Sequence, residues 1–278
     1  MTLRVLDGTL EGSSPYEILR DALEDYGGDV RIACSFGVED MVVLHEASRA
    51  GRDLGVTPRV FLLDTGRLHQ ETYDLVDRAR ERYGVDFEIY FPDTVRVEDL
   101  VRHKGANSFY SSIDNRRECC SIRKLGPLSR ALTGARAWVT GLRREQGPTR
   151  IDVRVMERDA ANGGIVKLNP LASWTSERVW AFVRENRVPT HALHAQGYPS
   201  IGCAPCTRAV VAGEDPRAQQ KGERIGEDAK LKWLRSMLDW QKELSDPVEF
   251  MESLHLDELD LERPSDRGRD VELQLARA

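Results

Sequence analysis

Four of the chain's five cysteines form two close pairs, and any fold of this chain has to accommodate both pairs. Cys119 and Cys120 are adjacent in R-R-E-C-C-S-I-R-K, and Cys203 and Cys206 follow much later in G-C-A-P-C-T-R. Four thiolates suit either a zinc ion or a [4Fe–4S] cluster. Adjacent cysteines fit a structural zinc knuckle poorly, so the pattern favours iron–sulfur, while zinc and free or disulfide-forming thiols stay open. The fifth cysteine, Cys34, lies in an apolar run and is predicted to be buried.

Charge and hydropathy narrow the class of protein. The net charge of −6 argues against a general nucleic-acid binder, although a local basic cluster can still hold a small anion. No apolar run reaches the roughly 20 residues that a membrane span needs, and the N-terminus lacks a signal-peptide pattern. We therefore expect a cytoplasmic protein. Because structural disulfides are rare there, the cysteine pairs indicate a metal or redox site.

Short β-branched runs alternate with amphipathic helical patterns through the first half of the chain. The pattern predicts strands at 29–34, 59–63, 87–91 and 135–140, and helices at 13–27, 40–49, 69–83, 95–104 and 122–132. This alternation is typical of a doubly wound α/β fold with a mostly parallel sheet. Ligands of such sheets bind at the carboxyl ends of the strands. The polar loops after the first, second and fourth strands fall on that edge.

The second half departs from this alternation. Two extended segments around Asn162-Gly163-Gly164 predict a hairpin at the sheet margin, and Thr175 caps a helix that runs to about Asn186. We divide the chain into an α/β domain at 1–212 and a divergent tail at 213–278. The tail is predicted to be helical at about 227–244 and partly disordered at its end.

Basic residues gather on the loops at the predicted strand ends, where an anion would need them. Arginine forks match the oxygens of phosphate and sulfate, so the cluster indicates a pocket for a multiply charged anion. The loop at 35–40 joins a strand to a helix and can point backbone N–H groups at a phosphate; an ordinary strand–helix turn is the alternative. His69, His191 and His194 are expected to make local hydrogen bonds. The basic cluster consists of Arg116, Arg117, Arg123, Lys124, Arg143, Arg144, Arg150, Arg208 and Arg217.

Taken together, these segments resemble the assimilatory sulfonucleotide reductases, and most closely the bacterial adenosine 5′-phosphosulfate (APS) reductases that carry a [4Fe–4S] cluster. The resemblance covers about residues 15–217. It includes S-F-G-V-E-D, L-D-T-G-R-L-H, E-C-C-S-I-R-K, W-V-T-G-L-R-R-E-Q and Y-P-S-I-G-C-A-P-C-T-R. The resemblance implies an adenine-nucleotide hydrolase-like fold with a modified pyrophosphate-type (PP) loop. It also implies that Cys119, Cys120, Cys203 and Cys206 hold a [4Fe–4S] cluster that tunes the site electrostatically.

The same resemblance implies roles for individual residues. Ser35, Gly37 and Glu39 would belong to the modified phosphate loop. Leu63, Thr65 and Gly141 would line the nucleoside pocket. The phosphosulfate would be contacted by Lys124, Arg144, Arg150 and Arg217. The cysteine quartet favours APS over its 3′-phosphorylated form, and the oligomeric state, monomer or homo-oligomer, stays open.

The chain departs from this family after Arg217. Members of the family carry a tail motif of the E-C-G-L-H type whose cysteine attacks the sulfate sulfur. Here no cysteine follows Cys206, so no catalytic nucleophile is assigned. We expect thiol-dependent reduction of APS to sulfite and AMP, with thioredoxin or another thiol donor acting in trans. Two alternatives stay open: an APS-binding sulfur- or sulfonyl-transfer enzyme without reductase activity, and an inactive binding or regulatory protein that docks a partner through 227–244.

Overall fold

The computed structural model describes residues 10–147 and 150–210, and every structural statement below concerns these residues. The predicted tail at 213–278, its helix at 227–244 and Arg217 lie outside them. The division of the chain at residue 212 is therefore still a prediction.

A six-stranded sheet with the order β3-β2-β1-β4-β6-β5 forms the centre of the fold. The strands are β1 (Val30–Ala33), β2 (Val60–Leu63), β3 (Phe87–Tyr90), β4 (Ala137–Val139), β5 (Met156–Asp159) and β6 (Ile165–Leu168). All neighbouring strands are parallel except β5, which pairs antiparallel with β6. The predicted doubly wound, mostly parallel sheet is confirmed, and so is the hairpin at its margin.

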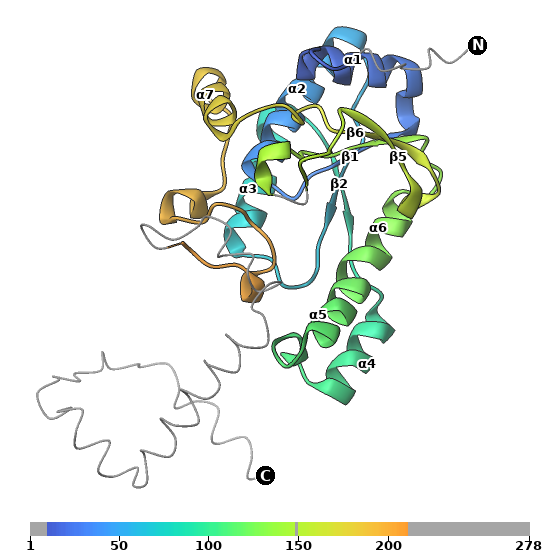
Figure 1. Ribbon diagram of the computed structural model, residues 1–278, viewed down its shortest axis with the longest axis vertical. Coiled ribbons are helices and arrows are strands. Elements are labelled where there is room, and N and C mark those ends of the chain that lie inside the picture. The colour runs from blue at the N-terminus through green and yellow to red at the C-terminus, as the bar shows by residue number, and fades with distance from the viewer. Residues whose placement is uncertain (1–9, 148–149, 211–278) are drawn as a thin grey trace, which may run out of the picture. The chain divides into compact units, whose positions relative to one another are not determined.

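Helices cover both faces of this sheet (Figure 1). They are α1 (Pro15–Tyr26), α2 (Val38–Leu54), α3 (Gln70–Tyr83), α4 (Thr94–Lys104), α5 (Ile113–Cys120), α6 (Gly126–Ala131) and α7 (Ser176–Asn186). The main core packs α1, α2, α3 and α7 on one face, with Ile18, Val42, Leu75 and Val179 among its buried side chains. On the other face, a smaller core joins Phe61 and Trp138 to Ala131 and Leu132 at the end of α6.

Helix boundaries follow the capping signals of the sequence. Ser14 and Glu17 form a reciprocal capping box at the start of α1, and Thr175 caps α7 through the Arg178 amide. Helix α2 continues past the predicted end at residue 49 to Leu54. It passes through Gly51, where an added Cβ would lie only 2.5 Å from the Val56 carbonyl oxygen and 2.8 Å from Pro58. Glycine at that position lets the following chain pack directly against the helix.

The sequence predicted that the first cysteine pair precedes a helix. In the structure, the pair lies inside a helical segment. Helix α5 ends at Cys120, a π-helical turn covers Ser121–Leu125, and α6 continues the run to Ala131. Single π turns often occur at functional sites. In this protein the turn includes Arg123 and Lys124, two of the basic residues that the sequence analysis singled out.

Candidate functional site

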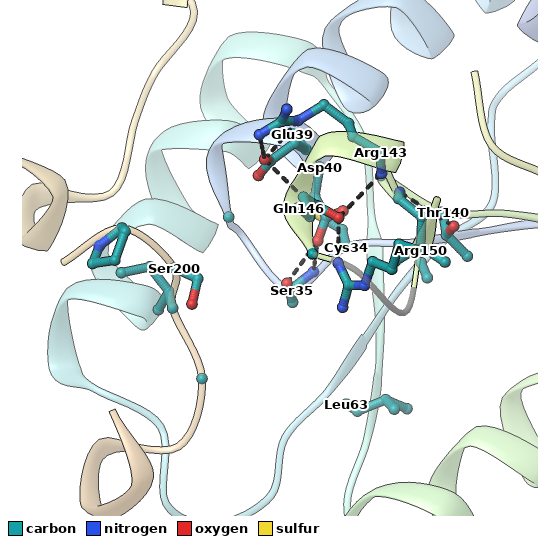
Figure 2. A pocket seen from close by; sticks show the side chains of 18 of the residues that line it. Cys34, Ser35, Glu39, Asp40, Leu63, Thr140, Arg143, Gln146, Arg150 and Ser200 are labelled. Carbon is teal, nitrogen blue, oxygen red and sulfur yellow. Dashed lines mark hydrogen bonds and ion pairs between the residues drawn. The ribbon is translucent and has the colours of Figure 1, made fainter. Parts of the chain in front are cut away.

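A cavity of about 1120 Å³ opens at the carboxyl ends of β1, β2 and β4. Strands β1 and β4 are neighbours in the sheet although they are far apart in the chain, so the strand order reverses there. Ligands of open α/β sheets bind at such switch points. The expected substrate residues within the described part of the chain all line this cavity: Ser35, Gly37, Glu39, Leu63, Thr65, Lys124, Gly141, Arg144 and Arg150. We call it the substrate cavity (Figure 2).

In the loop between β1 and α2, the donors of Ser35 are bonded within the protein. The carboxylate of Asp40 accepts hydrogen bonds from both the amide and the hydroxyl of Ser35, each at 2.6 Å. Phe36, which follows, is buried in a left-handed conformation (φ 64°), and its ring packs against Phe87 at a centroid distance of 5.2 Å. Strained backbone of this kind persists only where surrounding packing imposes it. The loop is thus held in a fixed shape by Asp40 and by the core.

Asp40 also reaches the loop after β4. The amide of Gly141 donates to its carboxylate, and an added Cβ on Gly141 would lie 2.4 Å from Asp40 Oδ1. Burial raises the pKa of Asp40 from 3.8 to about 6, although the hydrogen bonds from Ser35 act in the opposite direction. A single carboxylate therefore ties together two loops of the substrate cavity.

A second polar network joins the same loops. Arg143, whose side chain is 7% exposed, donates to Glu39 Oε1 through Nε at 3.0 Å and Nη2 at 2.8 Å. It also contacts Glu145 Oε2 at 3.0 Å and the carbonyl of Trp174. Gln146 donates to the same Glu39 oxygen at 2.9 Å. Oε1 of Glu39 therefore binds side chains of the protein in this structure, while Glu39 also lines the substrate cavity.

The expected phosphosulfate contacts differ in how they are placed. The guanidinium of Arg144 donates to the Val153 carbonyl at 2.7 Å and to Glu11 at 2.6 Å, so it is held by the protein itself. Arg150 donates to the side-chain oxygen of Gln146 and lines the substrate cavity. Lys124 lies in the π turn and lines the same cavity. Arg217 lies outside the described residues.

The four paired cysteines line a second, smaller cavity of about 250 Å³, which we call the cysteine cavity. Two hydrogen bonds bring the second pair to the first. The Ala204 amide donates to the Arg67 carbonyl at 2.8 Å, and the Tyr110 hydroxyl donates to the Pro205 carbonyl at 2.7 Å. The cavity is also strongly basic, since its lining includes Arg67, Arg116, Arg123, Lys124 and Arg150.

The two cavities are continuous in their lining. Lys124, Arg150 and Cys203 belong to both, together with residues 200–202. The hydroxyl of Thr65, at the end of β2, lies 3.2 Å from the sulfur of Cys203. Arg123 donates to the Thr65 carbonyl at 2.7 Å. Any group held by the cysteines would thus be separated from the substrate cavity by a few side chains only.

The four paired cysteines share the lining of one cavity. A mononuclear zinc site holds each thiolate about 2.3 Å from the metal. Within residues 10–147 and 150–210, no three His, Cys, Asp or Glu side chains are grouped that tightly around one point. No cysteine forms a disulfide, and Cys34 is buried with a pKa well above its ordinary value because it is desolvated. The four paired cysteines thus form no disulfide and line one cavity.

The histidines serve the packing of the segment that leads to the second pair. His191 is buried, with Nε2 3.0 Å from the Thr72 hydroxyl and Nδ1 accepting from the Leu193 amide. Burial lowers its pKa to about 4, and the neighbouring His194 and His69 add to the effect. His191 and His194, whose Nδ1 lies 2.8 Å from the Tyr198 carbonyl oxygen, make the expected local hydrogen bonds, whereas the buried Nε2 of His69 has no hydrogen-bond partner among the described residues.

Sequence reasoning missed three residues that organise the site: Asp40, Arg143 as the partner of Glu39, and Gln146. Each acts through contacts between segments far apart in the chain, which no local pattern reports. The only signal in the sequence was their position, since all three lie in the segments that follow predicted strands. In the described part of the chain, no helix combines the length and hydropathy that crossing a bilayer would require.

The sequence of this chain matches a known protein family and is similar to known reductases. Residues 29–209 match the family model described as the phosphoadenosine phosphosulfate reductase domain. An adenosine 5′-phosphosulfate reductase of Allochromatium vinosum is 52% identical over 186 residues, which cover 67% of this chain and 71% of that protein.

Two further relatives extend the comparison. The chloroplastic 5′-adenylylsulfate reductase 3 of Arabidopsis thaliana is 48% identical over 80% of this chain, but the chain spans only 48% of that longer protein. The crystal structure of phosphoadenylyl-sulfate reductase from Candida auris, a phosphate complex, has a TM-score of 0.61 at 30% identity. It covers 73% of this chain and 93% of that one. The expected adenine-nucleotide hydrolase-like fold is confirmed.

Proposed function

Because the chain belongs to the phosphoadenosine phosphosulfate reductase family, we propose that it binds APS and takes part in its thiol-dependent reduction to sulfite and AMP. The observation that carries the proposal is the convergence of Ser35, Thr65, Lys124, Gly141 and Arg150 on one cavity at the switch point of the sheet. Cysteine usage supports a cytoplasmic site of action. The reaction would serve sulfate assimilation.

The residues divide the work of binding between the two ends of the substrate. Leu63, Thr65 and Gly141 lie at the strand ends, where a planar base and its ribose fit against backbone and apolar surface. Lys124 and Arg150 approach from different segments and are the cations for the phosphosulfate. Arg217 is the further proposed contact. Arg144 would have to leave Glu11 and Val153 to join them.

The chemistry requires two thiols. The first attacks the sulfate sulfur, the bond from that sulfur to the bridging oxygen breaks, and AMP leaves with the electron pair. A second thiol then attacks the sulfur of the first, which releases sulfite and leaves a disulfide. Cations beside the phosphate stabilise the charge that develops on the departing AMP.

We propose that the attacking thiol comes from a separate molecule such as thioredoxin. The printed sequence contains no cysteine between Thr207 and Ala278. Cys34 is buried with a raised pKa, which makes it a poor nucleophile, and the other four cysteines form the quartet.

We propose that Cys119, Cys120, Cys203 and Cys206 hold a [4Fe–4S] cluster. Support comes from the donor set and from the shared lining of the cysteine cavity. When bound, the cluster supplies fixed charge beside the substrate. The basic side chains around the quartet would offset the negative charge of four thiolates.

The cofactor is tested by measuring iron and acid-labile sulfide in anaerobically purified protein. We expect about four of each per chain, and a loss of both in the Cys119→Ala and Cys206→Ala variants. Cys34→Ala is the matched control and should keep the full content. Zinc in place of iron, or full iron content in Cys206→Ala, would refute the assignment.

Binding is tested by calorimetry with APS, AMP and adenosine. We expect APS to bind more tightly than AMP, because the sulfonyl group adds a second anionic group with further oxygen acceptors for Lys124 and Arg150 to contact. Equal affinities for APS and adenosine would contradict the proposed orientation. Release of AMP from APS without sulfite would instead favour sulfonyl transfer to another acceptor.

A further inference from the structure

Gln146 occupies a position between groups of opposite character (Figure 2). On one side its Nε2 donates to Glu39 Oε1 at 2.9 Å. On the other side its Oε1 accepts from the Arg143 amide at 3.1 Å and from the guanidinium of Arg150. The side chain is partly buried and lines the substrate cavity.

Only a side chain with one donor end and one acceptor end satisfies these partners. Glu39 is a carboxylate and only accepts, whereas the Arg143 amide and the Arg150 guanidinium only donate. The orientation of the Gln146 amide is therefore fixed by its neighbours. A carboxylate at this position would face the carboxylate of Glu39, and an aliphatic side chain would remove the hydrogen bonds to Glu39, the Arg143 amide and Arg150.

The consequence falls on Arg150. An arginine side chain has many rotamers, so an interaction that fixes its guanidinium before the ligand arrives reduces the entropic cost of binding. Gln146 is itself fixed through Glu39, which belongs to the first turn of α2 and is also bonded by Arg143. Arg150 is thereby linked to the loop after β1, on the other side of the substrate cavity.

We propose that Gln146 is the positioning residue of Arg150: it holds the guanidinium in the substrate cavity, where it meets the phosphosulfate, and couples it through Glu39 to the β1–α2 loop. The inference rests on the proposed function for the identity of the ligand. The geometry that carries it, a bridging amide between Glu39 and Arg150, is independent of the reaction.

The first test is APS binding by Gln146→Leu, which keeps the approximate size and removes the side-chain hydrogen bonds to Glu39, the Arg143 amide and Arg150. We expect a loss of affinity of about tenfold, which corresponds to one charge-assisted hydrogen bond. In the Arg150→Ala background the same substitution should cost less than about twofold, because its target is gone. Gln70→Leu is the matched control: Gln70 is exposed on α3, bonds only Asp74 among the described contacts, and should leave affinity unchanged.

The second test uses Gln146→Glu and pH. When protonated, the new carboxyl group can donate to Glu39 and accept from Arg150 as the amide does, so affinity should approach that of the wild type at low pH. As pH rises, the two carboxylates repel one another and the ionised group neutralises Arg150, so affinity should fall. Arg143, Glu145, Glu39 and Arg150 are the charged groups around this position. A pH profile parallel to that of the wild type would overturn the inference.

A crystal structure of substrate-free Gln146→Leu gives a readout that does not depend on APS. We expect the Arg150 guanidinium to leave its wild-type position while Glu39 and Arg143 stay paired. An unmoved guanidinium would refute the positioning role. If wild-type protein fails to bind APS, the proposed function fails, and the place of Arg150 in this variant still decides the inference. Should Gln146→Leu not fold, the pH profile of Gln146→Glu decides it.

Discussion

Opposite charges meet at Glu39 and Arg143 in a place that solvent scarcely reaches. Their side chains are 15% and 7% exposed, and three hydrogen bonds converge on one oxygen of Glu39. Desolvating such a pair is costly, so its value lies less in net stability than in the geometry that it imposes. It fixes the loop after β1 relative to the loop after β4, between which the substrate cavity opens.

Removing one partner of this pair leaves the other charge buried without compensation. Arg143→Gln should therefore lower the free energy of unfolding by about 3 kcal/mol, measured by urea denaturation. Arg102→Gln is the matched control. Arg102 pairs with Asp99 in the open, with exposures of 74% and 56%, and its loss should cost less than about 0.5 kcal/mol. Equal losses in the two variants would mean that the Glu39–Arg143 pair is not a buried anchor.

The raised pKa of Asp40 makes a prediction about pH. Because the folded state binds this proton more tightly than the unfolded chain does, the associated stability is fully present below pH 3.8. It is lost as pH rises through about 6. The effect amounts to at most about 3 kcal/mol. Asp40→Asn removes this titration. The variant should therefore gain unfolding free energy relative to the wild type as pH rises from 4 to 7. A difference that does not vary with pH would contradict the assignment.

At the level of elements, periodicity and capping residues predicted nearly all of the fold. Strands, the hairpin and helix α7 appear where the pattern placed them, because each buries a regular set of apolar side chains. The sequence missed what depends on contacts between elements. The extension of α2 past Gly51 depends on Pro58 packing against it, and the π turn after Cys120 has no pattern of its own.

The same division applies to the candidate site. Residues that follow strand ends, such as Thr65 and Gly141, were predictable because parallel strands bring their carboxyl ends together. Two other features could not be predicted: the ion pair of Arg144 with Glu11, and the hydrogen bonds of the Gln146 amide. Both depend on side-chain geometry between residues far apart in the chain.

The close approach of the β4 loop to α2 predicts a specific sensitivity. In Gly141→Ala the new methyl group would lie 2.4 Å from Asp40 Oδ1 and 2.9 Å from Glu39 Cβ. The β4 loop must move, so we expect a loss of about 1–3 kcal/mol in unfolding free energy and weaker APS binding. Gly28→Ala, at an open position, serves as the control and should be close to neutral. An unaffected Gly141→Ala would show that the two loops are not in contact.

Across the molecule, the two cavities meet at a few shared side chains. Lys124 and Cys203 line both, and Thr65 contacts Cys203 from the substrate side. Substrate charge and the charge of whatever the quartet holds therefore act on the same residues. If the quartet holds the proposed cluster, its charge would act on substrate binding through Lys124 and Thr65.

Lys124 is the cation with which the electrostatic coupling between the two cavities is best tested, because it lines both. Lys124→Ala should weaken APS binding by about 10- to 100-fold, as expected for loss of a charged hydrogen bond. It should also make the affinity less sensitive to ionic strength. Arg130→Ala removes a cation of the adjacent helix that bonds the Phe91 carbonyl and lines neither cavity, and it should leave APS affinity unchanged. Equal losses of APS affinity in the two variants would show that Lys124 acts only through the overall charge of the protein and makes no specific contact with APS.

The most direct test of the account is product analysis with sulfur-labelled APS under anaerobic conditions, using iron–sulfur-loaded protein with and without reduced thioredoxin. We predict sulfite and AMP in equal amounts, formed only when the thiol is present, and neither product from the Arg150→Ala variant above background. Sulfite formed by the protein without any added thiol would contradict the proposed external nucleophile. Intact APS in the presence of thioredoxin would contradict the reductase function itself.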